Sequence, residues 1–364
     1  MDANPKKTVA VGISGGVDSA MAAQILMMAG YDVIGITMSI WNEAIPITEA
    51  TKSGCFGPGE KDDLIAAEQI CQKLGIPHHV LRLQDEYSDN VLSYFCSTYI
   101  SGKTPNPCLM CNQRMKFGLL PQKAREAGIE FQYFATGHYV RVSYNQLLQR
   151  YQLFKACDTS KDQSYFLSFL HQDQLANIIF PLGDKTKVQI KAFACENGFV
   201  ELAEKQESQD FLESDDYSVL FDKDTFAPGE IKDMQGKVIG KHNGLINYTI
   251  GQRRNLGISG QAEPHYVISI DSKTNSLVVG TQQHLMHNTC TAINVNWLSV
   301  DCPLKPFSAT AKIRAQHEAA ACIVTPLDAN SFSVEFVQAQ LSITPGQGIV
   351  LYEGDMVLAG GIIA

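Results

Sequence analysis

Features that would place this 364-residue chain in a membrane are missing from its sequence. No apolar run approaches the roughly 20 residues needed to span a bilayer. No apolar core of signal-peptide type follows residues 1–7, which lead directly into the first predicted strand. The sequence also contains no internal repeat and no low-complexity segment. We therefore expect a soluble, cytoplasmic protein that makes no contact with membranes.

An excess of positive charge is also missing. The chain has 29 Lys and Arg against 38 Asp and Glu, which gives a net charge of −9 at pH 7. This balance argues against a general nucleic-acid binder, because such proteins neutralise many phosphates. It still allows a local basic face. The ten cysteines are expected to be thiols, metal ligands or catalytic groups, because structural disulfides are rare in the cytoplasm.

The first part of the chain alternates apolar runs with helical patterns. Runs at residues 8–13, 31–38, 78–83 and 131–137 are typical of strands, and a helical pattern over residues 61–74 stops at Gly75. Such alternation predicts an α/β fold with a doubly wound parallel sheet. Ligands of this fold bind at the carboxyl ends of the strands.

After about residue 206, glycine turns become frequent and the predicted strands become short. From about residue 265, regularly spaced strands predict a small β-barrel. A chain of this length should hold two or three domains, and the change of pattern places a domain boundary at about residue 206.

A glycine-rich loop, Ser14-Gly15-Gly16-Val17-Asp18-Ser19, joins the first predicted strand to a helical pattern over residues 20–29. Because glycines lack Cβ atoms, backbone N–H groups at this helix start can approach an anion closely. The spacing fits neither Walker A nor GxGxxG. It resembles the pyrophosphate loop of enzymes that cleave ATP between the α and β phosphates. A carboxylate repels phosphate, so Asp18 is expected either to bind the Mg²⁺ that ATP carries or to cap the next turn.

A second motif, Asn106-Pro107-Cys108-Leu109-Met110-Cys111-Asn112, predicts a helix that begins with a good N-cap and a proline. We expect this helix to run to about Gly118 and to kink or end at Pro121. Cys108 and Cys111 are three residues apart and share a face. The positive end of the helix dipole is expected to lower the pKa of both thiols.

Cys55 is the best candidate for a third thiol at this site. It lies in a glycine-rich loop after the second predicted strand, at the same edge of the sheet. A structural zinc site would need two further ligands at suitable spacing, and the sequence has no second CxxC motif.

Several segments then occur in a characteristic order along nearly the whole chain. Besides SGGVDS and TPNPCxxCN they are ATGHY (135–139), KDQSYFL (161–167), FPLG (180–183), ESQD (207–210) and YTIGQR (248–253). Together they resemble the bacterial tRNA-uridine 2-sulfurtransferase family, MnmA or TrmU. The resemblance implies an ATP-binding catalytic domain of pyrophosphate-loop ATPase type over residues 1–205. It implies that a small central domain (206–275) and a C-terminal β-barrel domain (276–364) help to hold the tRNA. It also implies that ATP adenylates the 2-oxygen of the wobble uridine in tRNAs for Lys, Glu and Gln, after which sulfur displaces AMP.

The resemblance also implies roles for individual residues. Cys111 corresponds to the family's nucleophilic cysteine, and ATP is expected to require Mg²⁺. The implied ATP contacts are Gly12, Ile13, Ser14, Gly15, Gly16, Val17, Asp18, Ser19, Met38 and Gly137. The implied tRNA contacts are His138, Lys161, Asp162, Gln163, Arg314, Gln316 and Gln347.

The sequence departs from the best-studied members at two positions. Leu212 stands where those members carry the persulfide cysteine, and Cys108 stands where they have Asp. Sulfur can then be delivered in two ways. In one, Cys108 and Cys111 act as a pair, one carrying a persulfide and the other resolving it through a disulfide. In the other, Cys55, Cys108 and Cys111 bind a [4Fe–4S] cluster whose open iron position holds hydrosulfide.

Two other functions remain to be tested. One is that of a pyrophosphate-loop ligase or amidotransferase acting on a small molecule. The other is that of a non-catalytic tRNA-binding or iron–sulfur-sensing relative, which Leu212 suggests. The sulfur donor is expected to be a cysteine desulfurase or a sulfur-relay protein.

Overall fold

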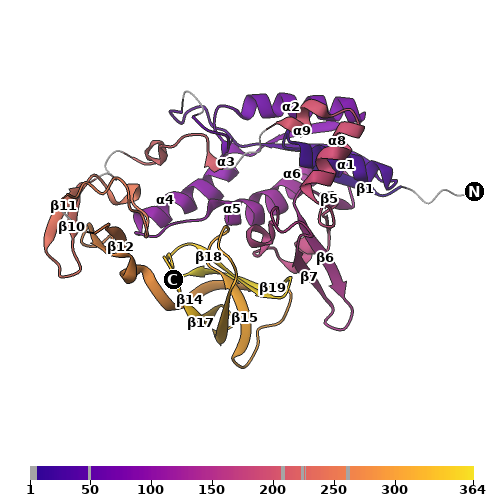
Figure 1. The fold of residues 1–364 in the computed structure, drawn as a ribbon. Coiled ribbons are helices and arrows are strands. Elements are labelled where there is room, and N and C mark those ends of the chain that lie inside the picture. Colours follow the sequence, from indigo (N-terminus) through magenta and orange to yellow (C-terminus); the bar gives the residue numbers. More distant parts are fainter. Residues whose placement is uncertain (1–5, 48–50, 206–209, 223–224, 226, 260–262) are drawn as a thin grey trace, which may run out of the picture.

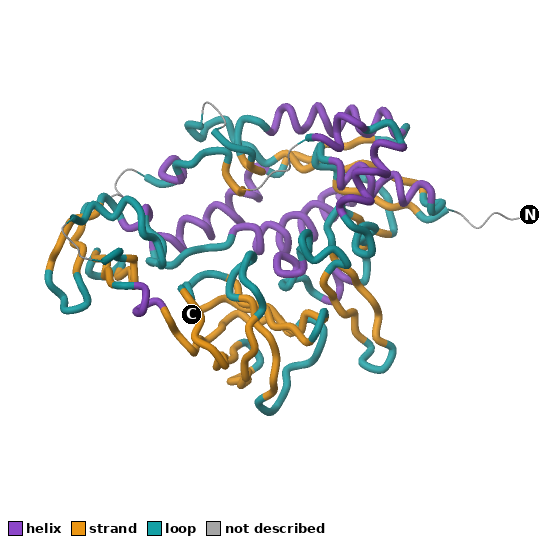
Figure 2. Tube along the Cα trace, in the orientation of Figure 1, coloured by secondary structure: helices purple, strands orange, loops and turns teal. Residues whose placement is uncertain are grey.

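The computed structural model describes residues 6–47, 51–205, 210–222, 225, 227–259 and 263–364. Figure 1 shows three parts: an α/β part at the top, a small sheet at one side, and a C-terminal barrel at the bottom. Helices α4 (Ser93–Ile100), α5 (Pro107–Met110) and α6 (Leu120–Glu126) cross the middle of the molecule between the α/β part and the barrel. Figure 2 shows the same division as helix-rich and strand-rich regions.

The α/β part is built on a five-stranded sheet with the order β4-β2-β1-β5-β8, and every pairing in it is parallel. This sheet confirms the predicted α/β fold. The chain moves outward from β1 in both directions, so the sheet has a switch point between β1 and β5, where such folds bind ligands. Its strands are β1 (Thr8–Gly12), β2 (Asp32–Ser39), β4 (His78–Arg82), β5 (Tyr133–Ala135) and β8 (Ile178–Ile179).

Helices cover this sheet and extend from it toward the barrel. The predicted stop of α2 at Gly75 is confirmed, because this residue is left-handed, with φ 69°. The α-helices are α1 (Val17–Met28), α2 (Glu60–Leu74), α3 (Gln84–Tyr87), α4 (Ser93–Ile100), α5 (Pro107–Met110), α6 (Leu120–Glu126), α7 (Gln172–Leu175), α8 (Lys187–Glu196) and α9 (Val200–Glu204). The 3₁₀-helices whose residues the structure describes are η3 (Ser164–Leu167), η4 (Tyr217–Leu220), η6 (Leu245–Asn247) and η7 (Gln282–Leu285).

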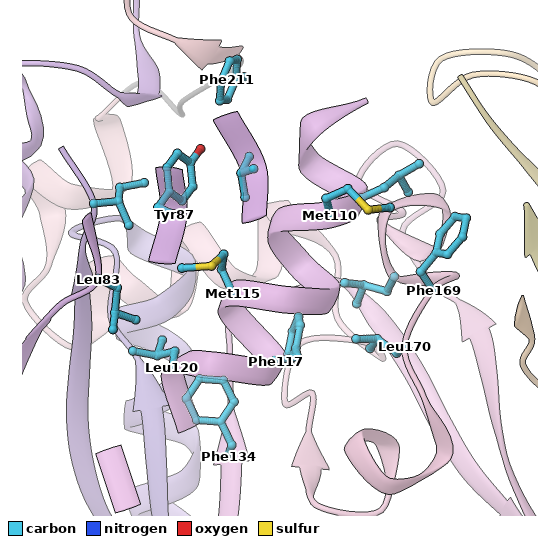
Figure 3. Packing of buried hydrophobic residues seen from close by; sticks show 14 of the residues in the cluster. Leu83, Tyr87, Met110, Met115, Phe117, Leu120, Phe134, Phe169, Leu170 and Phe211 are labelled. Atoms are coloured by element: carbon cyan, nitrogen blue, oxygen red, sulfur yellow. The ribbon is translucent and has the colours of Figure 1, made fainter. Parts of the chain in front are cut away.

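The cysteine helix differs from the prediction in its middle and at its end. After α5 the chain forms a π-helix, η2 (Cys111–Leu119), and then continues as α6. Pro121 does not end the helix, because it lies in the first turn of α6. Figure 3 shows Met115 and Leu120 reaching from this helix toward Tyr87 and Leu83. A second π-helix, η1 (Ser88–Leu92), precedes α4.

The small sheet has the order β11-β10-β13-β12. Its own core contains Ile231, Val267, Leu277 and Val279, which are fully buried. The strands are β10 (Gly229–Lys232), β11 (Val238–His242), β12 (Tyr266–Asp271) and β13 (Ser276–Gly280).

Six C-terminal strands form a closed barrel, because β14 pairs with both β17 and β19. This confirms the predicted C-terminal barrel. The hairpin of β6 (Val140–Asn145) and β7 (Arg150–Lys155) extends the barrel sheet from the α/β part through β19. The barrel strands are β14 (Met286–Trp297), β15 (Phe307–Lys312), β16 (Ala320–Asp328), β17 (Ser331–Leu341), β18 (Gly348–Glu353) and β19 (Met356–Ile363).

A two-stranded parallel sheet stands beside the α/β part. In it β3 (Gly54–Phe56) pairs with β9 (Asp210–Leu212), so that Gly54 lies opposite Asp210 and Phe56 opposite Leu212. Glu207, Ser208 and Gln209 of the ESQD segment lie outside the described residues. None of the described helices is both long and apolar enough to cross a lipid bilayer.

Candidate active site

A cavity of about 370 Å³ opens at the carboxyl ends of β1, β2 and β5. It brings the glycine-rich loop and the three predicted thiols to one place, although Cys55 lies 37 positions after Asp18 and Cys111 lies more than 90 positions after it. The predicted site residues that line it are Gly12, Ile13, Ser14, Gly16, Val17, Asp18, Ser19, Met38, Cys55, Cys108, Cys111, Gly137, His138 and Gln163.

The glycine-rich loop has a conformation that only glycine adopts without strain. Gly15 has φ +76°, and a Cβ atom on it would lie 2.9 Å from the carbonyl oxygen of Asp63. The hydroxyl of Ser19 donates to the carbonyl of Gly16 at 2.9 Å and accepts from the N–H of Ser14 at 3.2 Å. The loop is therefore held in shape by its own hydrogen bonds before any ligand binds.

Asp18 does not cap the start of α1, where the N-cap residue is Gly16. Its carboxylate forms a bidentate ion pair with Lys187, both distances being 2.7 Å, and accepts a hydrogen bond from the hydroxyl of Tyr139 at 2.7 Å. Lys187 is almost fully buried. No local pattern in the sequence pointed to this partner, which lies 169 residues away.

Gly137 allows the end of β5 to pack directly against the start of α1. A Cβ atom at Gly137 would lie 2.6 Å from the carbonyl carbon of Asp18 and 2.7 Å from the nitrogen of Ser19. Any larger residue would therefore displace the glycine-rich loop. This contact gives Gly137 a structural role in addition to the predicted ATP contact.

Glu60 was not predicted, although it lines the cavity. Its carboxylate accepts from the N–H groups of Ile40 at 2.6 Å and Trp41 at 2.8 Å, and from the hydroxyl of Ser39 at 2.8 Å. These bonds fix the chain where it leaves β2, next to Met38. The only sequence signal was the position of Glu60 at the start of a helix, which is common for acidic residues.

Lys205 is a second cavity residue that sequence reasoning missed. Its ammonium donates to the carboxylate of Asp63 at 3.0 Å and lies 3.5 Å from the carbonyl oxygen of Gly15. This places an exposed cation directly beside the glycine-rich loop.

The predicted lowering of the cysteine pKa values is wrong. Burial raises the pKa of Cys108 to about 12, and the thiols of Cys55 and Cys111 add to this. Burial likewise raises the pKa of Cys111 to about 11, against a smaller opposing effect of Lys116. The positive end of the α5 dipole does not offset this rise in pKa, because removing a thiolate from water costs more free energy than the dipole contributes.

His138 lines the cavity next to η2, the π-helix that begins at Cys111. Its Nδ1 lies 2.8 Å from the hydroxyl of Thr136, and its ring packs against Phe117. Burial, helped by the charge of Lys116, lowers the pKa of His138 to about 3. The imidazole is therefore neutral at physiological pH.

Leu212 is fully buried and does not line the cavity, whereas its neighbours Phe211 and Glu213 do. This alternation is expected in a strand, where successive side chains point to opposite faces. Glu213 accepts from the N–H of Gly59 at 2.7 Å. Strand β9 thus fixes the position of Cys55 on β3, while Leu212 is a core residue.

The remaining predicted tRNA contacts lie outside the cavity. Asp162 accepts from the N–H of Ala156 and from both the N–H and the hydroxyl of Ser164. Gln347 donates to the carbonyls of Thr104 at 3.2 Å and Pro105 at 3.0 Å, which joins the barrel to the loop before Cys108. The other predicted contacts that do not line the cavity are Lys161, Arg314 and Gln316.

The three thiols share the cavity without converging on a point. Among the described residues, no three His, Cys, Asp or Glu side chains are close enough together to hold a metal ion. The arrangement therefore does not fit a site for a single metal ion. An iron–sulfur cluster distributes its thiolate ligands over separate iron atoms, so it requires a wider spacing than one ion does.

Three family models match successive parts of the chain. The tRNA methyl transferase HUP domain matches residues 7–212, the tRNA methyl transferase PRC-barrel domain matches residues 218–281, and the Aminomethyltransferase beta-barrel domain matches residues 287–363. They correspond to the α/β part, the region of the small sheet and the barrel.

Close relatives match over nearly their whole length. The tRNA-specific 2-thiouridylase MnmA of Endomicrobium trichonymphae is 44% identical over 357 residues, 98% of both chains. The tRNA-specific 2-thiouridylase MnmA 2 of Thermoanaerobacter sp. (strain X514) is 43% identical and covers 98% of this chain and 97% of its own. The tRNA-specific 2-thiouridylase MnmA of Nostoc punctiforme is 42% identical, and the match covers 98% of this chain and 99% of the relative.

Proposed function

The chain belongs to the tRNA-specific 2-thiouridylase family, and we propose accordingly that it thiolates the 2-position of the wobble uridine in tRNAs for Lys, Glu and Gln, using ATP. The observation that carries this proposal is the shared cavity. It places a loop suited to the phosphates of ATP beside two cysteines on one helix. Activation and sulfur transfer can then occur on one uridine without its leaving the site.

In the first step, the uridine 2-oxygen attacks the α phosphorus of ATP. An oxygen–phosphorus bond forms, the bond between the α and β phosphates breaks, and pyrophosphate leaves. Residues of the loop at the start of α1 line the cavity, and backbone N–H groups at such a helix start suit the leaving pyrophosphate. Mg²⁺ bound with ATP would neutralise phosphate charge, and Asp18, the carboxylate of the loop, is the residue that would hold it.

In the second step, we propose that a persulfide on Cys111 supplies the sulfur. Its terminal sulfur attacks C2, and the carbon–oxygen bond breaks so that AMP leaves. The Cys108 thiolate then attacks the Cys111 sulfur, which forms a Cys108–Cys111 disulfide. The electron pair of the broken sulfur–sulfur bond stays on the sulfur of 2-thiouridine. A cellular dithiol reduces the disulfide, and a cysteine desulfurase or a sulfur-relay protein reloads the persulfide.

A second route for the sulfur is favoured by one observation, the presence of Cys55 in the same cavity as Cys108 and Cys111. Three thiolates would hold a [4Fe–4S] cluster with one iron open, and such a cluster would supply the sulfur atom directly. Iron and acid-labile sulfide in anaerobically purified protein distinguish the routes. Their absence with activity retained supports the cysteine pair, and their presence with loss of activity in Cys55→Ser supports the cluster.

We also propose that the small sheet and the barrel help to hold the tRNA. Lys161 and Arg314 are suited to phosphates, while Gln163 and Gln316 are suited to base edges or sugars. His138, Gln163 and Gln347 lie at or next to the cavity. A local basic face of this kind is compatible with the overall negative charge.

The test is mass spectrometry of nucleosides from tRNA that was incubated with the protein, ATP, Mg²⁺ and a sulfur source. The expected result is 2-thiouridine, with one AMP and one pyrophosphate for each residue formed. A small-molecule ligase would instead form AMP without any need for tRNA. A non-catalytic tRNA-binding or iron–sulfur-sensing protein would bind tRNA and form no 2-thiouridine with any sulfur donor.

A further inference from the structure

The π-helix η2 brings Lys116 onto the same face as Cys111. In an α-helix of 3.6 residues per turn, a residue five positions further on points roughly 140° away. In a π-helix the hydrogen-bonded partner of position i is i+5, so Lys116 stands one turn beyond Cys111. The pattern is visible at the end of η2, where the N–H of Leu120 donates to the carbonyl of Met115.

Pro121 and Gln174 explain why the helix widens here. Pro121 has no N–H, so the carbonyl of Phe117, four residues earlier, lacks its usual helical donor. The side-chain amide of Gln174, on α7, donates to this carbonyl at 3.0 Å and to the carbonyl of Gln113 at 2.9 Å. One side chain from another element therefore donates to two carbonyls of η2, including the one that Pro121 leaves without a helical donor.

Lys116 differs from Lys205, which also lines the cavity, in having no ion-pair partner among the described residues. Lys205 is paired with Asp63, and Lys187, which lies behind the cavity residue Asp18, is paired with that carboxylate. Lys116 lines the cavity and forms no hydrogen bond or ion pair of its own within the described part of the chain. A half-buried ammonium without a counter-charge is costly. The surroundings of Lys116 are therefore suited to an anion that binds or forms there during the reaction.

The neighbours of Lys116 indicate which anion this is. The lysine interacts electrostatically with Cys111, Cys55 and Cys108, and its charge acts on His138. Lys116 and the three cysteines line the same cavity, with Cys111 five positions before the lysine on η2. An anion that forms on one of these sulfur atoms would therefore face the ammonium of Lys116.

We propose that Lys116 is a catalytic residue that contacts the anionic sulfur nucleophile at Cys111, and that Gln174 is the positioning residue that keeps η2 open and so directs Lys116 there. This inference rests on the proposed function, since it assigns Lys116 to the sulfur-transfer step. The chemistry is that of a fixed cation beside a reacting anion, which stabilises charge without having to reorganise.

The first experiment compares Lys116→Met, Lys116→Arg and the matched control Lys123→Met, whose lysine lies on α6 with Glu86 and Glu126 as partners. Lys116→Met is expected to slow 2-thiouridine formation about a hundredfold, while tRNA-dependent exchange of labelled pyrophosphate into ATP stays within twofold of the wild-type rate. Lys116→Arg is expected to recover part of the loss, and Lys123→Met to match the wild type.

The second experiment tests Gln174 with Gln174→Glu. This change keeps the oxygen that accepts from the N–H of His171 and removes the amide that donates to η2. Thiolation is expected to fall about tenfold with exchange retained. If Gln174 acts through Lys116, Gln174→Glu adds no further loss in the Lys116→Met background.

The outcomes separate the inference from the proposed function. If wild-type protein forms no 2-thiouridine, the function itself is wrong. If the wild type thiolates and Lys116→Met thiolates equally fast, or loses pyrophosphate exchange in parallel with thiolation, the role assigned to Lys116 is wrong. If Gln174→Glu lowers thiolation equally in both backgrounds, its effect does not act through Lys116.

Discussion

In the half of the cavity that contains the glycine-rich loop, charged side chains are already paired with protein groups. Asp18 is bound by Lys187 and Tyr139, and Glu60 by backbone N–H groups. In the half that contains the thiols, Cys108 and Cys111 are protonated at neutral pH because burial raises their pKa values. Lys116 lines this half without an ion-pair partner among the described residues. The half with the glycine-rich loop is therefore preorganised for the nucleotide. The half with the thiols lacks a counter-charge for Lys116 until an anion forms or binds there.

This difference suits a reaction in two steps. A rigid phosphate site lowers the cost of activation, because its donors need not reorganise when ATP binds. A buried thiol that ionises only when loaded or when faced with the activated uridine is protected from side reactions, since the thiolate is the reactive form. The comparison predicts that the two halves can be inactivated separately.

The largest effect is expected for Cys111→Ser. Thiolation should fall by at least about a thousandfold, as is usual when a nucleophile is removed, while tRNA-dependent pyrophosphate exchange continues. Cys157→Ser is the matched control, because Cys157 is exposed and does not line the cavity. Loss of exchange in Cys111→Ser would show that the halves are not separable.

Lys187→Met should damage the nucleotide half. It leaves the carboxylate of Asp18 without its cation, so we expect the free energy of unfolding to fall by about 3 kcal/mol and pyrophosphate exchange to fall with it. Lys191→Met, which changes an exposed residue of the same helix α8, should alter stability by less than about 0.5 kcal/mol. Chemical denaturation measures both, and equal effects would argue against a preorganised Asp18.

Leu212→Cys tests whether the family's usual cysteine position can serve in this chain. The side chain is fully buried on the face of β9 that points away from the cavity. We expect a loss of about 1 kcal/mol in stability from the smaller side chain and no gain in thiolation. Faster thiolation, or a persulfide found on residue 212 by mass spectrometry, would contradict the assignment of Leu212 to the core.

The smallest effect concerns acid stability. The pKa of His138 is about 3 in the folded protein and near its ordinary value when unfolded. Only the unfolded chain then binds a proton between these values, so stability falls as the pH decreases from about 6.5 toward 3. His138→Gln should remove about 1 kcal/mol of the loss between pH 7 and pH 5.5. Unchanged pH dependence of thermal unfolding in that variant would show that His138 titrates normally.

The sequence predicted what depends on neighbours along the chain. The strand before the glycine-rich loop, the αL stop at Gly75 and the helix start at Pro107 all follow from local rules. Residues that act across the fold left no such signal: Lys187 meets Asp18 only because α8 packs beside α1. Lys116 was missed for a different reason. Helical periodicity of 3.6 places it away from Cys111, and only the π-helix, which depends on Gln174, reverses this.

The central claim is that the uridine 2-oxygen is activated as an adenylate and leaves with AMP. It can be tested with an anticodon stem-loop whose wobble uridine carries ¹⁸O at the 2-position. Mass spectrometry of the products should find one ¹⁸O atom in AMP for each 2-thiouridine formed and none in pyrophosphate. Formation of 2-thiouridine with unlabelled AMP would contradict the account.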